Sequence, residues 1–340
     1  MKWIFILLGV LLFLFLFCFA FAKAIHFSVF GKRQEGNPYL KYFTAEDFDN
    51  LKAEPISFLN GNGEKLRGFF YSQKDRKEFK ALVLFVHGMG GGHLSYTTEI
   101  NALTKQGYLV MSYDNTGTMA SEGKALKGLG QSILDLQQAL RFVKGNDFTK
   151  EMPIFLMGHS WGAYTVCRIM GQNPAVQGVV AFSPFENTPK LLCDQIRQQT
   201  KIPMPFLKPW FAFFEFRKFG KIATGNTSEQ ILKSDIPLLL LHGEADPVVP
   251  MQNAPIVNPK VQKQKNVTCI SYPKKQHNVY ASLEAESYIA ESFAKLLKLV
   301  KEKKQDEANA FSKTLDFHKM CEEDETVMQT VFDFIEKNLK

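Results

Sequence analysis

The sequence lacks the cysteine patterns that mark zinc sites and small disulfide-stabilised domains. Its five cysteines contain no CxxC pair and no spacing typical of metal ligands, and a chain of 340 residues can build a stable core without disulfides. Cys167 and Cys269 fall in segments predicted as a helix and a strand, where we expect small buried apolar residues. The sequence predicts no metal site and implies no organic cofactor.

Patterns typical of nucleic-acid and nucleotide binding are also missing. The net charge of +7 comes from basic residues spread along the chain, without a lysine and arginine block interleaved with aromatics. The glycine-rich segment 87–92 is followed by neither GKS nor GKT and does not match GxGxxG, which argues against a phosphate-binding loop. We therefore expect no nucleic-acid partner.

Charge is absent from the beginning of the chain. Trp3 to Ala22 are twenty uncharged residues rich in Leu and Phe. As a helix that rises ~1.5 Å per residue, they would cross a hydrocarbon core of ~30 Å. We predict a single-pass transmembrane anchor over residues 1–24. A cleaved signal has a shorter apolar region, typically ~7–15 residues, but the tract Ala20-Phe21-Ala22 also reads as a cleavage site, so secretion after cleavage is the alternative.

The charges around this run do not settle its orientation. Lys2 precedes it, whereas Lys23, Lys32 and Arg33 follow it, so a strict positive-inside count would keep the rest of the chain inside. A very short tail before an apolar run nevertheless resembles an uncleaved export signal, and we expect an extracytoplasmic domain. Residues 25–52 lack strong periodicity and predict a juxtamembrane linker.

The rest of the chain, residues 53–340, alternates between short apolar runs and amphipathic segments. Segments 54–59 and 65–71 flank Asn60-Gly61-Asn62-Gly63 and predict an antiparallel hairpin at a sheet edge. Amphipathic helices separate the later apolar runs, as is typical of a parallel sheet covered on both faces. We predict an α/β fold with a mostly parallel eight-stranded sheet. The further predicted strands are 81–86, 108–113, 153–157, 176–182, 237–241 and 267–272.

A GxSxG motif, Gly158-His159-Ser160-Trp161-Gly162, lies between the predicted strand 153–157 and a helical run that extends through Arg168. A serine on a sharp strand-to-helix turn has an exposed hydroxyl, and the flanking glycines let the backbones pack closely. The next backbone N–H, that of Trp161, would face the reacting carbonyl. In this context the motif predicts Ser160 as a nucleophile.

A serine nucleophile needs a base and a carboxylate that orients the base. With this strand–turn–helix pattern, both follow the serine on loops after later strands. Asp246 follows the strand 237–241 and is fixed by Pro-Val-Val-Pro, so we favour it over Glu244. His277 follows the last predicted strand, whereas no strand immediately precedes its rival His318. We predict Asp246 as the acid and His277 as the base.

The glycine-rich segment after strand 81–86 can supply a second donor to an oxyanion. In His87-Gly88-Met89-Gly90-Gly91-Gly92, the N–H of Met89 stands where this donor belongs. Such donors are worth several kcal/mol each in acyl transfer. We predict the backbone N–H groups of Met89 and Trp161 as an oxyanion hole.

From about Glu54 onward, the sequence resembles the α/β-hydrolase superfamily, and within it the serine aminopeptidase-like and monoacylglycerol-lipase-like group of bacterial hydrolases. The resemblance implies Ser160, Asp246 and His277 as nucleophile, acid and base, in agreement with the spacing. The chain departs from the family at residues 115–118, where many relatives carry Arg before the Gly, and in its long tail after His277. The matching residues are His87-Gly88, Asp114, Gly117, Ser121, Gly123, the GxSxG turn at Ser160 (the nucleophile elbow), His242-Gly243, Asp246 and His277.

Residues 186–235 interrupt the alternation and are rich in aromatic side chains. We interpret this insertion as a small helical cap over the active site, with Phe211 and Phe214 lining an apolar cleft for the substrate. The alternative is that these aromatics hold the cap against the core. Seven of them fall within fourteen residues, namely Phe206, Trp210, Phe211, Phe213, Phe214, Phe216 and Phe219.

Together these residues predict a serine hydrolase that cleaves a carboxylic ester with an apolar acyl group, either a small molecule or a lipid met at a membrane surface. Dehalogenases and epoxide hydrolases of this fold use aspartate at the elbow, so the serine argues against both. A peptidase or amidase would use the same machinery, and a non-catalytic binding domain is the alternative from another class. The sequence determines neither the exact substrate nor the oligomeric state.

Overall fold

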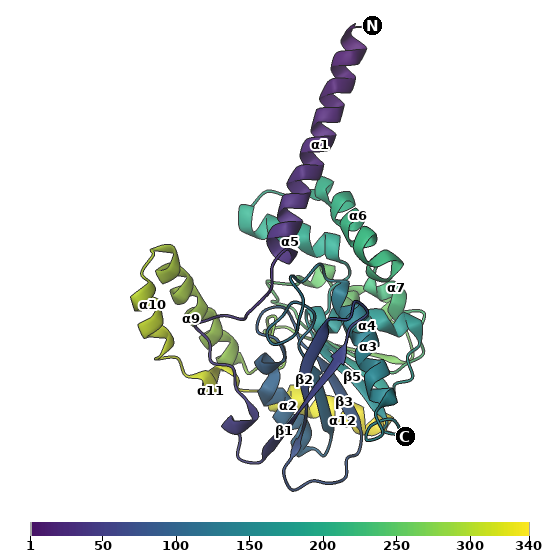
Figure 1. Ribbon diagram of the computed structural model, residues 1–340, viewed down its shortest axis with the longest axis vertical. Helices are drawn as coiled ribbons and strands as arrows, with labels where there is room; N and C mark the ends of the chain where they lie inside the picture. The colour runs from purple at the N-terminus through teal and green to yellow at the C-terminus, as the bar shows by residue number, and fades with distance from the viewer. Residues whose placement is uncertain (1, 340) are drawn as a thin grey trace.

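An eight-stranded sheet lies between two layers of helices in the computed structural model, which describes residues 2–339 (Figure 1). The strand order is β1-β2-β4-β3-β5-β6-β7-β8. β2 runs antiparallel to both neighbours, and the other pairs are parallel. The predicted fold class is confirmed. The strands are β1 (Leu51–Leu59), β2 (Lys65–Gln73), β3 (Leu82–Val86), β4 (Leu109–Tyr113), β5 (Ile154–His159), β6 (Gly178–Phe182), β7 (Leu238–Gly243) and β8 (Val267–Tyr272).

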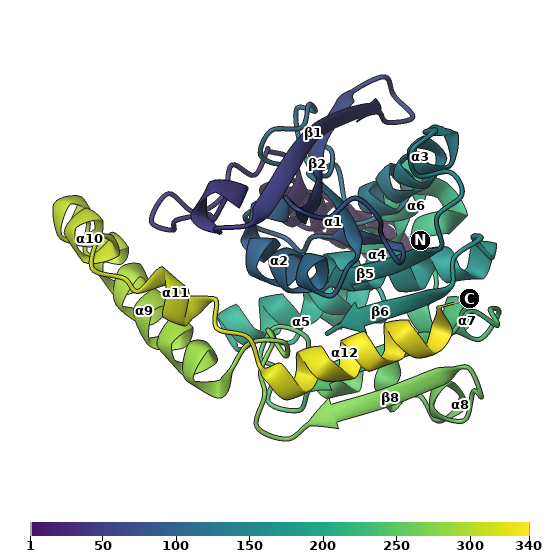
Figure 2. The same ribbon diagram turned by 90° about the horizontal axis from the view of Figure 1, so that it is seen from below.

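The central strands are buried on both sides because they are apolar at nearly every position. In β3, Leu82, Leu84 and Val86 face a helical layer that includes α3 and α4, whereas Val83 and Phe85 face α2 and α12. Figure 2 shows α12 lying along the sheet. Apart from α1, the insertion and α9–α11, the helices are α2 (Thr97–Lys105), α3 (Gln131–Gly145), α4 (Trp161–Ile169), α8 (Pro259–Gln262) and α12 (Glu325–Asn338).

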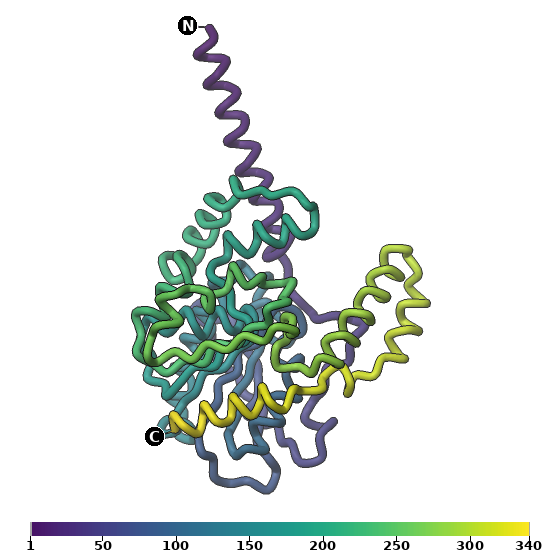
Figure 3. Tube along the Cα trace, turned by 180° about the vertical axis from the view of Figure 1, so that it is seen from behind, coloured from purple at the N-terminus to yellow at the C-terminus, as the bar shows by residue number. Residues whose placement is uncertain are grey.

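The N-terminal helix α1 (Lys2–Phe30) is longer than the predicted anchor. It contains an apolar window long enough to cross a membrane, and no part of that window is buried in the protein. Figures 1 and 3 show this part projecting away from the domain. In contrast, Ala22, His26 and Phe30 are buried against the domain. Residues 25–30 therefore belong to a docked helix and not to the predicted linker.

The remainder of the predicted linker is fixed on the domain by hydrogen bonds. The guanidinium of Arg33 donates to the backbone carbonyls of Met119, Ser121 and Gly123 over 2.7–2.8 Å. The absence of periodicity therefore reflects an extended chain held by specific contacts, and the segment is part of the domain surface.

Two further helical regions extend the domain beyond the sheet and its covering helices. The first is the insertion after β6, which is helical as predicted and whose helix α6 packs on α1. The second is the tail after His277, where α9 and α10 project to one side (Figure 2). Their helices are α5 (Thr188–Thr200), α6 (Lys208–Phe219), α7 (Thr227–Ile231), α9 (Leu283–Lys301), α10 (Gln305–Ser312) and α11 (Phe317–Met320). Short 3-10 helices include η2 (His93–Tyr96) and η4 (Pro205–Leu207).

Candidate active site

The connection between β5 and α4 is the sharp turn that the GxSxG motif predicts. Ser160 has a positive φ of 54°, a conformation that residues other than glycine rarely adopt. A Cβ at Gly162 would overlap the backbone carbonyl of Val86, and a Cβ at Gly158 would overlap the backbone of Gly162. Only glycine permits this approach of β3, β5 and α4. The two glycines therefore hold Ser160 at the tip of the turn.

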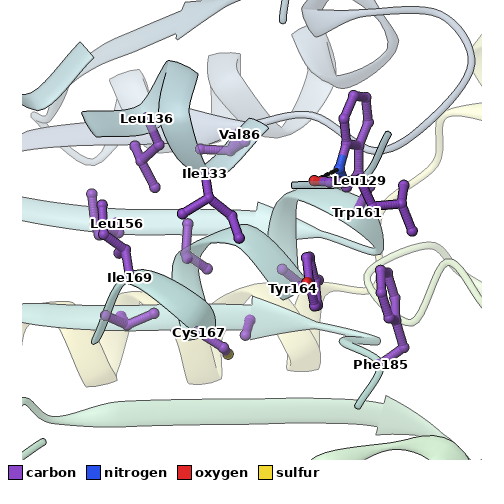
Figure 4. Close-up of a cluster of buried hydrophobic side chains, with 14 of the residues drawn as sticks. Val86, Leu129, Ile133, Leu136, Leu156, Trp161, Tyr164, Cys167, Ile169 and Phe185 are labelled. Carbon is purple, nitrogen blue, oxygen red and sulfur yellow. Dashed lines mark hydrogen bonds between the residues drawn. The ribbon is translucent and has the colours of Figure 1, made fainter. Parts of the chain in front are cut away.

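A buried cluster fixes the first turns of α4 behind the serine (Figure 4). Trp161 is 1% exposed, and its indole N–H donates to the backbone carbonyl of Leu129 at 2.8 Å. The ring of Tyr164 stacks on that of Phe185 with centroids 4.4 Å apart. Cys167 is buried in the same cluster, as predicted. This packing fixes the backbone N–H of Trp161 next to Ser160.

Asp246 and His277 form a hydrogen-bonded pair. Nδ1 of His277 lies 2.8 Å from Oδ2 of Asp246, whose Oδ1 accepts from the backbone N–H groups of Val248 and Val249. Burial by itself would raise the pKa of Asp246, but the hydrogen bond and charge of His277 outweigh it and hold that pKa below its ordinary value. Asp246 is therefore a carboxylate that can orient the imidazole. This leaves Nε2 of His277 for Ser160, and both residues line one cavity.

The structure separates the rival residues from this pair. Glu244 is exposed, and its carboxylate accepts from the hydroxyl of Ser271 at 2.7 Å. His318 is exposed in α11, with its ring centroid 5.0 Å from that of Phe43. Neither side chain lines the cavity that contains Ser160.

Met89 and Trp161 flank Ser160 with backbone N–H groups that are free to bind an acceptor. Within residues 2–339, neither N–H has a hydrogen-bond partner. The loop that carries Met89 is held in place from the preceding segment, because the N–H of Gly90 donates to Oε1 of Gln34 at 3.1 Å. Both predicted donors thus border the cavity or the turn that carries Ser160.

A hydrogen-bonded pair that the sequence did not reveal joins three loops of the site. The hydroxyl of Tyr96 accepts from the N–H of Gly88 at 2.9 Å and lies 2.8 Å from Nδ1 of His159. Nε2 of His159 lies 3.1 Å from the backbone carbonyl of His277. Since a carbonyl only accepts, Nε2 carries the proton and Nδ1 accepts from Tyr96. The position of His159 inside the motif was the available signal.

The ring of His159 is neutral in the folded protein. Burial, followed by the nearby charge of His277, lowers its pKa to about 3. A neutral ring can accept from Tyr96 and donate to His277 at the same time. His159 therefore links the loop before Met89 to the loop that carries His277.

These groups open into a cavity of about 410 Å³, a volume typical of small-ligand sites. Ser160, His277 and Met89 form part of its wall, and most of the remaining wall is apolar. The apolar part comes from the segment before β1, from η2 and from α9 and α11. Its larger side chains from these elements are Leu40, Phe43, Leu94, Ile289, Phe293, Phe317 and Met320, and Tyr280 from the segment between β8 and α9 adds to them. Within residues 2–339, no group of three His, Cys, Asp or Glu side chains could hold a metal ion.

The prediction that Phe211 and Phe214 line the substrate cleft is corrected by the structure. Phe211 is fully buried in the core, and the ring centroid of Phe214 lies 5.5 Å from that of Phe19 on α1. Trp210 contacts Phe15 and Phe19 edge to face. The physical reason is that α1 offers the insertion an apolar partner of its own. The insertion is therefore a docking surface for α1, and its aromatics do not line the cavity.

The strand order and the turn between β5 and α4 are those of the α/β-hydrolase fold. A family model described as serine aminopeptidase, S33, matches residues 77–220, which include the glycine-rich loop and the GxSxG motif. The chain therefore has the α/β-hydrolase fold, and over residues 77–220 it is similar to this hydrolase family.

Curated relatives match at low identity. A lysophosphatidylserine lipase, ABHD12 of Macaca fascicularis, is 26% identical over 186 residues, which are 51% of this chain and 43% of the relative. The protein RP471 of Rickettsia prowazekii is 27% identical over 137 residues, 39% of this chain and 57% of the relative. The chain thus spans about half the length of these relatives. YfhR of Escherichia coli O157:H7 is 23% identical over 61% of this chain and 67% of its own.

Solved structures confirm the fold. The esterase Pf2001 of Pyrococcus furiosus superposes with a TM-score of 0.60 at 17% identity, covering 91% of this chain and 99% of the esterase. Est1E of Butyrivibrio proteoclasticus, solved with ferulic acid, gives a TM-score of 0.51 at 18% identity over 70% of this chain and 97% of Est1E.

Proposed function

We propose that this chain is a membrane-anchored serine esterase that acts on carboxylic esters with an apolar acyl chain. Ser160 is the nucleophile, His277 the base and Asp246 the acid of the proposal. The observation that carries it is convergence: Ser160 and His277 line one cavity, and Asp246 holds His277 through a 2.8 Å hydrogen bond.

In the proposed reaction, Nε2 of His277 takes the hydroxyl proton of Ser160 while Oγ attacks the ester carbonyl carbon. The N–H groups of Met89 and Trp161 stabilise the charge that develops on the carbonyl oxygen. The C–O bond to the leaving group then breaks, and His277 gives the proton to the departing alkoxide. Water attacks the acyl-enzyme in the same way, which releases the carboxylic acid and restores Ser160.

The charge of the cavity favours an ester over an aminoacyl substrate. An aminopeptidase holds a free α-amino group, for which an ionised carboxylate is the natural partner. Among the residues that line the cavity, Glu99 is the acidic one, and it is 4% exposed. Burial and the nearby Glu323 raise the pKa of Glu99 well above its ordinary value, so it offers little attraction to an ammonium. Peptidase activity, which the family description suggests, is the second candidate.

The short connection between α1 and the cavity supports a substrate taken from a membrane. α1 ends at Phe30 and the cavity wall begins at Asn37, so the intervening stretch spans at most ~24 Å. A site this close to a membrane helix, with an apolar wall, suits a lipid ester. The similarity to a lysophosphatidylserine lipase is in keeping with such a substrate.

We propose that α1 is retained as the anchor and that the domain is extracytoplasmic. Cleavage after Ala22 would remove Phe15 and Phe19 and uncover the ring of Trp210 that they contact. It would also cut a continuous helix whose last turns are buried in the domain. These contacts favour the anchor over the cleaved signal.

A fluorophosphonate probe tests the nucleophile. We expect the full chain in detergent to be labelled and Ser160→Ala to be unlabelled, because the phosphorus reacts with an activated serine. The matched control is Ser183→Ala, a serine near the site whose hydroxyl donates to the backbone carbonyl of His277; it should retain labelling. A folded wild-type chain without labelling would rule out both the esterase and the peptidase.

A substrate panel then separates the two enzymes. Aliphatic p-nitrophenyl esters and aminoacyl p-nitroanilides are compared by kcat/KM with Ser160→Ala as the blank. The proposal expects the esters to be the better substrates. A preference for aminoacyl anilides with a free amino group would favour the peptidase.

A further inference from the structure

We propose that the outward face of the α5–α6 insertion is embedded in the membrane interface beside α1, where it contacts anionic phospholipids. This assignment rests on the proposed retention of α1 as an anchor. We call the surface the interfacial face. It consists of the exposed residues Ile202, Phe206, Phe213 and Phe216 with the basic residues Lys208 and Arg217.

The length of α1 places the insertion at the membrane. The charge-free run Trp3–Ala22 is ~30 Å long as a helix, which matches the hydrocarbon core. Trp210, near the start of α6, contacts Phe15, so only the run from Trp3 to Leu14 extends beyond the insertion. This run is ~18 Å long at ~1.5 Å per residue, well short of the core. A bilayer that covers the whole charge-free run must therefore also reach α6.

The helix α6 carries apolar side chains both on the face toward the protein and on the face away from it. Its inward face carries Phe211 and Phe214, which are buried. Its outward face carries Phe213 and Phe216, which are 45% and 51% exposed. A helix at the surface of a soluble domain presents polar residues outward. Phe206 and Ile202, in the chain just before α6, are 51% and 57% exposed and extend the same apolar character.

The charges of the insertion fit an anionic partner. Residues 197–221 contain six basic residues and one acidic residue, Glu215. That single acid is buried and lies 3.4 Å from His26 on α1, so the exposed charges of residues 197–221 are all positive. Arg197 lies 3.8 Å from Asp194 of α5, and the other five basic residues leave the net charge positive. Exposed lysine and arginine side chains beside an apolar surface can extend to lipid phosphates while their aliphatic parts stay in the interface. Trp210 between α1 and α6 is also a residue typical of this depth.

Bromolipid quenching of tryptophan fluorescence tests the proposal on the full chain. The chain carries three tryptophans. Trp3→Phe and Trp210→Phe leave the buried Trp161 as background, and Phe206→Trp adds a reporter on the interfacial face. The protein is reconstituted in phosphatidylcholine and phosphatidylglycerol vesicles with or without bromine on the acyl chains. We expect the added fluorescence of Phe206→Trp to be mostly quenched in brominated vesicles.

Two matched reporters make the result decisive. Phe148→Trp replaces a phenylalanine that is 48% exposed and precedes β5, at the amino ends of the parallel strands; it should be unquenched. Leu11→Trp reports on α1 itself and should be quenched. Quenching at Leu11 but not at Phe206 would overturn the interfacial face and leave the anchor intact. Loss of quenching at Leu11 would instead reject the anchor.

The preference for an anionic headgroup is tested by placing the brominated acyl chains either on phosphatidylglycerol or on phosphatidylcholine. At equal mole fraction, brominated phosphatidylglycerol should quench Phe206→Trp more strongly than brominated phosphatidylcholine, because the basic residues gather anionic lipid around the insertion. The difference should shrink in Lys208→Gln/Arg217→Gln. Equal quenching by the two lipids in Phe206→Trp with Lys208 and Arg217 intact would overturn the anionic preference.

Discussion

The α5–α6 insertion and the α9–α11 tail are both helical additions to the same sheet, yet they meet different partners. The insertion is dense in aromatics, of which Trp210, Phe211 and Phe214 pack on α1 and the core. The tail has few aromatics, and two of them, Phe293 and Phe317, line the cavity that contains Ser160. Aromatic density therefore indicates that a segment needs an apolar partner, but it does not identify the partner.

The same comparison explains why the tail is long. The segment between His277 and α12 builds α9–α11, which place Ile289, Phe293 and Met320 on the cavity wall. The sequence pattern predicts that the insertion lies next to the active site, but α9 and α11 of the tail lie there instead. The insertion packs against α1.

The largest expected effect tests whether the tail supplies the catalytic base or only lines the cavity. His277→Ala should lower kcat by several orders of magnitude, because the members of a triad act as a unit. His318→Ala, an exposed histidine within the tail, should change kcat by no more than a few fold. Steady-state ester hydrolysis by the two variants measures both. A collapse of kcat in His318→Ala with normal activity in His277→Ala would assign the base to the tail.

The second prediction concerns stability. Phe211→Ala should reduce the free energy of unfolding by ~3–5 kcal/mol, because a fully buried phenyl ring leaves a cavity. Phe317→Ala should cost less, because this half-buried ring already borders an open cavity. Urea titrations of both variants in detergent give the difference. Equal losses of unfolding free energy would contradict the assignment of Phe211 to the core and Phe317 to the cavity wall.

The third prediction concerns acid. The pKa of His159 falls from 6.5 to about 3 on folding, so between these values the unfolded chain binds a proton that the native chain does not. This contribution to stability is complete above the unfolded pKa and is lost as pH falls. At about pH 5 the loss approaches ~2 kcal/mol. The stabilisation from Asp246, whose folded pKa is held below its ordinary 3.8, is complete above that value and is lost only at lower pH.

Thermal unfolding at about pH 7.5 and about pH 5 checks this sign. The change in Tm on going to the lower pH should be less unfavourable in His159→Gln than in the wild type, because an amide can replace both hydrogen bonds without titrating. An unchanged pH dependence in His159→Gln would show that other groups govern acid stability. The buried His87 and His242, whose pKa values burial also lowers, act in the same direction as His159. Asp135 and Glu323, whose pKa values burial raises to about 6 and about 7, act in the opposite direction, so the comparison with His159→Gln isolates the effect of His159.

The sequence predicted the parts of the molecule that short stretches determine. Each strand follows from a local apolar run, and the positions of Ser160, Asp246 and His277 follow from strand ends that meet at one edge of a parallel sheet. The cavity wall could not be predicted in this way. Leu40 and Phe317 line it together although they are far apart in the chain, and no local pattern encodes that contact.

The role of α1 was missed for a related reason. The apolar run predicts an anchor independent of the domain, but the last turns of α1 are buried against the domain. The contact of Phe15 and Phe19 with Trp210 depends on how the insertion folds, which the periodicity of α1 does not reveal.

Chain-length preference tests the central claim, that α9–α11 and not the insertion form the acyl wall. For p-nitrophenyl esters, kcat/KM should rise from acetate to octanoate by up to ~0.8 kcal/mol per methylene. Phe317→Ala and Phe293→Ala should flatten this rise, whereas Phe213→Ala, in the insertion, should leave it unchanged. A best rate with acetate, or a rise flattened by Phe213→Ala but not by the two tail variants, would contradict the account.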